Sequence, residues 1–310
     1  MKIVVFGPAK HVGVLDGDRI FDLNAVDPEL PPELLRLIEL GLRGKERAAK
    51  AVAGMSGAAP DGQKVFAASG VQLHAPWPGK RIACAGGNYA AHSYGMALNR
   101  GTTDVTIEKM AAQMRAAGNW GFWKVLDAAA GPGSEIPYPS RAAYFDYEGE
   151  VAIIIGKRGK NIRKDQIDEY VWGVTIANDW SNRDAGGPQR AMSFNLAKNF
   201  DFSVSLGPSI AAGKIDPQDV DLETRVNGEV RQKYNSRDMV FSFAEILEFL
   251  STDFTFVPGD IILGGTGAGT AQDSTKVGAD GSRAHDLYLK RGDVVEVESP
   301  PIGRLQNRVV

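Results

Sequence analysis

The stretch YFDYEGEVAIIIG (residues 144–156) places two carboxylates, Glu148 and Glu150, at the start of a continuous apolar run. Alternate residues of a strand point to the same side, so these two side chains share one face, roughly 7 Å apart. Ala152 and Ile154 lie on the same face, which therefore becomes core within one further step. Two unpaired carboxylates there would repel each other and lose hydration. A cation between them would remove both penalties.

A third acid, Asp179, ends the apolar run YVWGVTIAND. If the connection 157–170 returns the chain so that the two strands lie side by side, the three carboxylates meet. Three oxygen donors without a cluster of histidines or cysteines suit Mg²⁺, Mn²⁺ or Ca²⁺ rather than zinc. On this pattern alone, two solvent-facing glutamates and a turn aspartate are an equally good interpretation.

The composition excludes several classes of function. The chain has 310 residues, 43 % hydrophobic and 24 % charged, which is ordinary for a globular protein of one large or two modest domains. A net charge of −3 without a lysine or arginine block argues against a nucleic-acid partner. No apolar run approaches the ~20 residues of a membrane span, and MKIVVFGPAK lacks the apolar core of a secretory signal. A single cysteine, Cys84, excludes an internal disulfide, so we expect a cytoplasmic protein.

Strand patterns outnumber helical ones along the chain. The 36 glycines and 16 prolines imply many turns, and Asn227-Gly228 is a strong type I′ hairpin signal. Strands do not alternate with helices as in a doubly wound fold. We therefore predict an α+β, β-rich fold with a mixed, rolled β-sheet core.

Three segments predict helices, and one predicts a linker. The helices are expected over 31–54, 102–118 and 241–251, the last with a capping box made by Ser242 and Glu245. LHAPWPGK (73–80) is the best linker, because its prolines favour extended chain. It divides a small N-terminal α/β domain, 1–75, from a main domain, 76–310.

Several motifs together resemble the fumarylacetoacetate hydrolase family, from about residue 80 to the C-terminus. In chain order they are GGNYAAH, DYEGEVAIIIGKRGKNI, WGVTIANDWSNRD, LAKNFDFSVSLGP, VNGEVRQ, PGDIILGGTGAG and GDVVEVESPPIGRLQNRVV. The resemblance implies the fold of that family's C-terminal domain preceded by the small N-terminal domain. It also implies that Glu148, Glu150 and Asp179 bind a metal, usually Mg²⁺ or Mn²⁺, and that the protein is a homodimer.

The same resemblance assigns further site residues. His92 matches the family's general base on water, and a histidine with its ordinary pKa near about 6.5 can transfer protons at neutral pH. Lys124 and Lys198 match lysines near the site, where a fixed ammonium stabilises a developing oxyanion. Arg183 and Thr266 match residues that bind substrate. Without the resemblance, Arg183 would be read as the partner of Asp184 in an ion pair.

Two positions depart from the family pattern. Many hydrolytic members have a glutamate three residues after the histidine, and this chain has Gly95 there. Glu108 in the predicted helix 102–118 is a candidate substitute, although a solvated helix position is the favoured interpretation. Gly267 stands where the family usually has proline. GGTGAG (264–269) is not a dinucleotide loop, because the residues that follow do not open a helix.

The first functional hypothesis is a metal-dependent hydrolase that cleaves a C–C bond in a 1,3-diketo acid or acylpyruvate. The alternative is an isomerase, decarboxylase or dehydratase of a 2-oxo acid, which uses the same enolate without water. A third is a metal-binding module without catalysis. The helix 102–118 is a candidate lid, and Trp120, Phe122 and Trp123 are candidates for an aromatic wall, although core packing is the commoner use of such residues. Cys84 is expected in a buried strand rather than as a nucleophile.

Overall fold

The computed structural model describes residues 1–310 except 56, 184–192 and 280–281. Within the described residues, a large mixed sheet of 12 strands dominates the fold. Its path is β4-β3-β2-β1-β14-β11-β10-β17-β6-β7, with β13 beside β11 and β5 beside β1. These strands are β1 (Lys2–Phe6), β2 (His11–Asp16), β3 (Arg19–Asp22), β4 (Val65–Ala67), β5 (Leu73–His74), β6 (Ile82–Ala85), β7 (Gly121–Lys124), β10 (Gly149–Ile155), β11 (Val171–Asp179), β13 (Val204–Leu206), β14 (Ile210–Ala211) and β17 (Ile261–Thr266).

Two smaller sheets complete the β structure. The first has the order β16-β15-β18-β19-β8, and the second pairs β12 with β9. Their strands are β8 (Glu135–Ile136), β9 (Tyr144–Asp146), β12 (Ser181–Arg183), β15 (Asp221–Val226), β16 (Glu229–Asn235), β18 (Val294–Ser299) and β19 (Gly303–Val309). The predicted β-rich α+β fold with a mixed sheet is confirmed.

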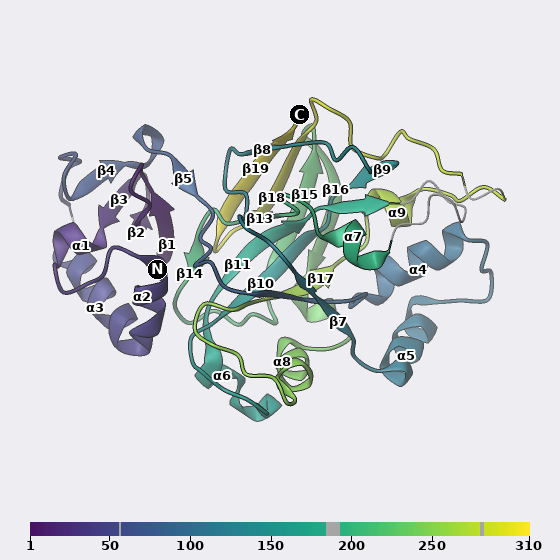
Figure 1. The fold of residues 1–310 in the computed structure, drawn as a ribbon, viewed down its shortest axis with the longest axis horizontal. Coiled ribbons are helices and arrows are strands. Elements are labelled where there is room, and N and C mark those ends of the chain that lie inside the picture. The colour runs from purple at the N-terminus through teal and green to yellow at the C-terminus, as the bar shows by residue number, and fades with distance from the viewer. Residues whose placement is uncertain (56, 184–192, 280–281) are drawn as a thin grey trace.

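The helices lie at the ends and on the outside of this β structure (Figure 1). They are α1 (Leu23–Val26), α2 (Leu34–Glu39), α3 (Gly41–Ala53), α4 (Ala90–Asn99), α5 (Ile107–Ala117), α6 (Ile167–Tyr170), α7 (Phe194–Lys198), α8 (Phe243–Ser251) and α9 (Ala271–Ser274). Helices α1 to α3 accompany the N-terminal strands, whereas α4 and α5 lie at the opposite end of the molecule (Figure 1). None of the helices in the described ranges has the length and apolar character needed to cross a membrane.

The central strand β10 is buried along its whole length because core covers both of its faces. Ile153 and Ile155 pack in a cluster with residues of the five-stranded sheet and α8. Ala152 and Ile154, on the face predicted to follow the two glutamates, belong to a cluster that extends to the N-terminal strands. This double burial explains why the sequence reads as a continuous apolar run rather than as alternating residues.

The N-terminal strands continue the central sheet. β1 pairs antiparallel with β14, with Lys2 opposite Ala211 and Ile3 opposite Ile210. Residues 1–75 therefore share a hydrogen-bonded sheet and part of a hydrophobic core with the main body. The division at residue 75 remains a prediction.

Two local patterns predicted from the sequence, a hairpin turn and a helix cap, are confirmed. Asn227 and Gly228 both have positive φ (52° and 83°), as a type I′ turn requires, and they join β15 to β16. Ser242 and Glu245 form the predicted capping box at the start of α8.

Two predicted helices have different limits in the structure. The segment 31–54 forms α2 and α3, and the chain turns between them at Gly41, which has φ 59°. The segment 102–118 becomes helical only at Ile107, after Thr106 caps the first turn by accepting from the backbone N–H of Lys109. Helix α4, which carries His92, was not among the predicted helices.

Candidate active site

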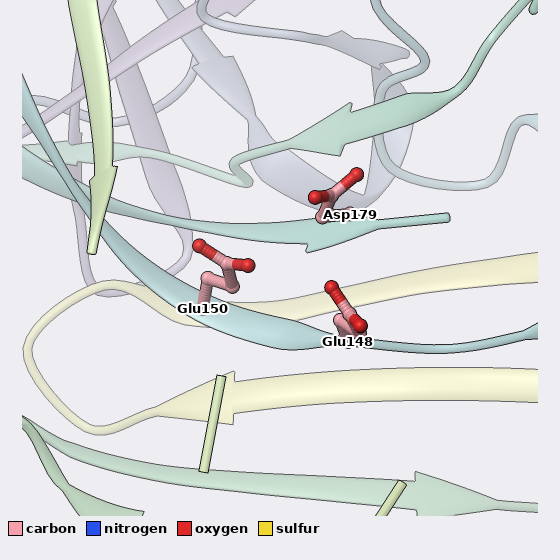
Figure 2. A group of neighbouring side chains, drawn as sticks. All are labelled: Glu148, Glu150 and Asp179. Carbon is pink, nitrogen blue, oxygen red and sulfur yellow. The ribbon is translucent and has the colours of Figure 1, made fainter. Parts of the chain in front are cut away.

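Glu148, Glu150 and Asp179 converge where β10 and β11 run side by side. These strands are antiparallel, with Gly149 opposite Asn178 and Glu150 opposite Ala177. One oxygen of each carboxylate lies within 4.8 Å of one from each of the others, and all three residues are buried. Figure 2 shows Glu148 and Glu150 projecting from one ribbon toward Asp179 on the neighbouring strand. The interpretation as solvent-facing glutamates is therefore wrong.

The three carboxylates differ in how their charge is balanced. Burial alone would raise the pKa of Glu148, but the nearby charges of Lys198 and Arg183 lower it well below its usual range. Burial raises the pKa of Glu150 far above its usual range, and the charges of Asp179 and Glu148 raise it further. Glu150 accepts a hydrogen bond from the backbone N–H of Gly265 (2.8 Å), and no ion pair between described residues includes it.

This donor set fits a divalent cation. A cation would neutralise Glu150, whose buried charge lacks a cationic side chain, and would relieve its repulsion from Asp179. Carboxylate oxygens alone are hard donors of the kind that Mg²⁺, Mn²⁺ and Ca²⁺ prefer. The residues Glu148, Glu150 and Asp179 could therefore hold the cation that the sequence pattern predicts.

Lys198 lies inside the acidic group, at the end of α7. Its Nζ donates to Glu148, to Asp179 Oδ2 (3.0 Å) and to Ser181 Oγ (2.6 Å). Burial alone would lower the pKa of Lys198, but the charges of Asp179 and Glu148 raise it. The ammonium is therefore fixed against the carboxylates and also lines the cavity described below.

Lys124, also predicted to act in catalysis, has a different environment. Its Nζ donates to the backbone oxygens of Lys198 (2.7 Å) and Ser203 (2.8 Å), and lies 2.5 Å from Asp179 Oδ1. The side chain is completely buried. With three acceptors around one ammonium, Lys124 is placed to hold Asp179 and the end of α7 rather than to reach a substrate.

Arg183 and Thr266 both line the cavity, and both engage neighbouring protein groups. The Arg183 guanidinium pairs with Asp146 (3.1 Å) and Glu148 (2.5 Å). Asp184, its alternative partner in the sequence analysis, lies outside the described residues. The Thr266 hydroxyl donates to the backbone oxygen of Gly149 (2.9 Å) and accepts from the side-chain amide of Gln232 (2.8 Å).

His92 approaches the carboxylates from the other side of the site, on the first turn of α4. The imidazole is buried, and its Nδ1 lies 2.5 Å from Oδ2 of Asp273 on α9. Because Nδ1 is engaged there, Nε2 is the ring nitrogen left for the cavity that His92 lines. Asp273 was not identified from the sequence. The only local signal was Thr270, three residues earlier, which caps α9 by accepting from the Asp273 N–H.

The short helix α9 corrects one prediction. We expected no helix after GGTGAG, whereas Ala271–Ser274 forms a single turn. Its first N–H groups are not available to a phosphate, since Asp146 accepts from Ala271 (2.9 Å) and from Gln272 (3.1 Å). The loop is still unsuited to a dinucleotide, but the reason is that Asp146 occupies the helix N–H groups and not that a helix is absent.

The acidic group and His92 line one cavity of about 440 Å³. Trp120, Phe122 and Phe194 form an aromatic wall, with ring centroids 5.6 Å apart for Trp120–Phe194 and 4.9 Å apart for Phe122–Phe194. Trp123 points to the other face of β7 and packs against Phe254, so the expected wall loses that residue and gains Phe194.

Two other expectations differ from the structure. Helix α5 contributes no residue to the cavity lining, and Arg115 ties it to Glu245 of α8 (2.6 Å), so it does not cover the site here. Glu108 is exposed at the start of α5 and does not replace the missing glutamate; Asp273 contacts His92 instead. Cys84 is buried in β6, as predicted, and burial raises the pKa of its thiol.

The sequence matches the family model described as fumarylacetoacetate (FAA) hydrolase C-terminal over residues 81–310. The chain therefore belongs to the fumarylacetoacetate hydrolase family. It is 30 % identical to the mitochondrial oxaloacetate tautomerase fahd2 of Xenopus laevis, over 100 % of this chain and 90 % of the relative. It is 31 % identical to the oxaloacetate tautomerase YisK of Bacillus subtilis, over 96 % of this chain and 94 % of the relative.

Solved structures share the fold over the whole chain. A 5-carboxymethyl-2-hydroxymuconate delta-isomerase from Mycobacterium smegmatis is 25 % identical with a TM-score of 0.69, covering 100 % of this chain and 99 % of that one. A maleylpyruvate hydrolase from Sphingobium sp. SYK-6, in complex with manganese(II) and pyruvate, is 24 % identical with a TM-score of 0.74 and the same coverage. The two sequence relatives are thus named tautomerases, and the two structural neighbours are named an isomerase and a hydrolase.

Proposed function

We propose that this protein is a divalent-metal-dependent tautomerase of a 2-oxo acid, with oxaloacetate as the first substrate to test. The observation that carries the proposal is that the acidic group and His92, which contacts Asp273, line one cavity. Relatives that align along almost the whole chain are named oxaloacetate tautomerases, which supports this class of reaction. The isomerase alternative of the sequence analysis is thus better supported than its first hypothesis, a C–C hydrolase.

Glu148, Glu150 and Asp179 are proposed to hold Mg²⁺ or Mn²⁺, with Ca²⁺ also compatible with the donor set. When bound, such a cation supplies positive charge that favours the enolate form of a 2-oxo acid over the keto form. Lys198 adds a fixed ammonium beside the same carboxylates. Lys124 and Arg183 keep Asp179 and Glu148 in place through their ion pairs.

The proton transfer is assigned to His92. In the keto-to-enol direction, Nε2 accepts a proton from the carbon next to the keto group as the C–C double bond forms, and then returns a proton to the enolate oxygen, which leaves His92 neutral again. No water is added and no carbon–carbon bond breaks. The aromatic wall of Trp120, Phe122 and Phe194 excludes water from the part of the cavity that it covers.

The test follows oxaloacetate by NMR in D₂O, with and without Mg²⁺ or Mn²⁺. We expect metal-dependent acceleration of deuterium exchange at the carbon next to the keto group, with no new acid product. The same assay on acylpyruvates in ¹⁸O-water tests the hydrolase. Two shorter products, with ¹⁸O in a carboxylate, would replace the tautomerase proposal by C–C hydrolysis.

Assembly and location are proposed only from the family resemblance and the composition. We propose a homodimer in the cytoplasm.

A further inference from the structure

The contact between His92 and Asp273 joins residues 181 positions apart in the sequence. Both side chains are buried, with 7 % and 3 % of their side-chain surfaces exposed. A buried carboxylate at 2.5 Å from Nδ1 favours a proton on that nitrogen and fixes the plane of the ring. The opposite nitrogen, Nε2, then exchanges protons in the cavity.

The Asp273 carboxylate is itself held in place by neighbouring groups. Both of its oxygens accept from the backbone N–H of Gly269 (3.0 and 3.1 Å), and Oδ1 also accepts from the Ser274 hydroxyl (3.0 Å). Asp146 anchors the first turn of α9 and pairs with Arg183, which in turn contacts Glu148. The position of Asp273 is thus linked by a chain of contacts to the acidic side of the site.

Gly95 is the feature that lets α9 come so close to α4. A Cβ at residue 95 would lie 2.8 Å from the backbone oxygen of Asp273 and 3.1 Å from its Cβ. Asn99, one turn further along α4, donates to the same backbone oxygen (2.5 Å). A glutamate at position 95 could not coexist with α9 in this place, because its first side-chain atom would overlap the Asp273 backbone.

We propose that Asp273 is the positioning residue for His92, and that it replaces, from a distant segment, the glutamate that family members carry three residues after the histidine. In this replacement, Gly95 stands where the glutamate would be, and Asp273 supplies the carboxylate instead. The inference rests on the proposed role of His92 in proton transfer. It specifies which ring nitrogen acts and what fixes it, whether the reaction is tautomerisation or hydrolysis.

The first experiment needs no substrate. In ¹⁵N-labelled protein, the ring-nitrogen shifts of His92 report its tautomer, and the chain has only 4 histidines to assign. We expect the neutral His92 ring to carry its proton on Nδ1 and to leave Nε2 without one. A neutral ring with its proton on Nε2 would overturn the proposal, whatever the reaction catalysed.

The second experiment uses Asp273→Asn with the metal supplied. An amide keeps the shape but loses the charge, so we expect kcat to fall about 100-fold, with KM and the dissociation constant for Mn²⁺ changed less than about threefold. His92→Ala/Asp273→Asn should be no slower than His92→Ala, because residues that act as a unit are not additive. Unchanged kcat in Asp273→Asn, or a double variant slower by the product of the single effects, would refute the positioning role.

A matched control comes from a second histidine–aspartate pair, His11 Nδ1 and Asp22 Oδ2, which lie 2.8 Å apart in the N-terminal strands. Asp22→Asn should alter the ¹⁵N shifts of His11 and leave kcat unchanged, since neither residue lines the cavity. If Asp22→Asn lowered kcat as much as Asp273→Asn, the effect would be a general loss of structure and the proposal would fail.

Discussion

The two sides of the candidate site are built in different ways. The acidic side comes from two adjacent antiparallel strands, β10 and β11, whose register brings Glu150 opposite Ala177 and so places Asp179 nearby. The opposite side comes from two helices, α4 and α9, whose contact joins residues 181 positions apart. The first arrangement follows from strand pairing, and the second depends on how distant segments pack.

The two sides should therefore differ in which substitutions they tolerate. On the acidic side, the cost of crowded charge is balanced by cations, so each change there should alter metal binding or stability. On the helical side, the fit depends on one glycine and one carboxylate. Changes there should alter the rate of proton transfer without affecting the metal.

The largest expected effect belongs to Glu150→Gln. An amide offers one neutral oxygen in place of a carboxylate, so we expect at least about a 1,000-fold loss of activity and a dissociation constant for Mn²⁺ weakened at least about 100-fold. Calorimetric titration with Mn²⁺ measures the affinity.

Metal-free protein provides the control for Glu150→Gln. Burial and neighbouring carboxylates raise the pKa of Glu150 far above its usual range and so favour its neutral form in the metal-free protein, and the equally neutral glutamine should not lower the metal-free Tm. Tight Mn²⁺ binding by the variant would mean that Glu150 is not a ligand. It would also contradict the expectation that changes on the acidic side alter metal binding.

Lys124→Met is expected to act through stability. Its ammonium is buried among Asp179 and two backbone oxygens, and removing one member of a buried ion pair costs about 3–5 kcal/mol. Denaturant unfolding of the metal-free protein measures the loss. Lys157→Met, which removes an exposed pair with Glu169, should change little. A Lys124→Met variant as stable as the native chain, but with a much slower chemical step, would return Lys124 to a direct catalytic role.

Gly95→Ala tests the helical side. Alanine is the better helix former by about 1 kcal/mol, but its Cβ would lie 2.8 Å from a backbone oxygen of Asp273, so α9 must shift. We expect kcat to fall about tenfold, as in other cases where a catalytic geometry is displaced, with Mn²⁺ affinity unchanged. Gly54→Ala, whose nearest contact would be an ordinary 3.4 Å, serves as the control. Full activity in Gly95→Ala would show that the spacing between α4 and α9 is not critical.

The smallest effect is expected at the aromatic wall. Phe122 faces the cavity and Trp123 faces the core beside Phe254, because successive residues of β7 point to opposite sides. Phe122→Leu should raise KM by about threefold to tenfold, a cost of roughly 1 kcal/mol for a lost aromatic contact. Trp123→Leu should lower Tm and leave KM unchanged. The reverse pattern would mean that substrate binds elsewhere in the site.

Much of the acidic side was predictable because its information is local. The parity of Glu148 and Glu150, the apolar run after them and the acid that ends the next strand selected the three carboxylates, and the family resemblance then favoured a metal site over solvent-facing acids before the structure placed them together. Lys198 was predicted near the site from the family pattern. The structure places it against Glu148 and Asp179 at the cavity, whereas Lys124 is completely buried between Asp179 and two backbone oxygens and does not line the cavity.

The helical side was only partly predictable. His92 was found from its motif, but α4 was not predicted as a helix, and Glu108 was the one candidate named to replace the missing glutamate. Glu108 was favoured as a solvated helix residue, and it is exposed. No local pattern connects position 95 to position 273. Gly95 showed in the sequence that the family's glutamate is absent. Only the packing of α9 against α4 shows why a glycine fits there.

The sequence by itself determined the family, the β-rich fold and the three carboxylates, because these depend on strand periodicity and on motifs in fixed order. The tertiary structure decided which lysine reaches the cavity, which aromatic residues line it, and which carboxylate orients His92. Those outcomes depend on the distance between segments far apart in the chain. The physical reason is that hydrogen bonds and steric overlap change within a few tenths of an ångström, a scale that sequence spacing does not specify.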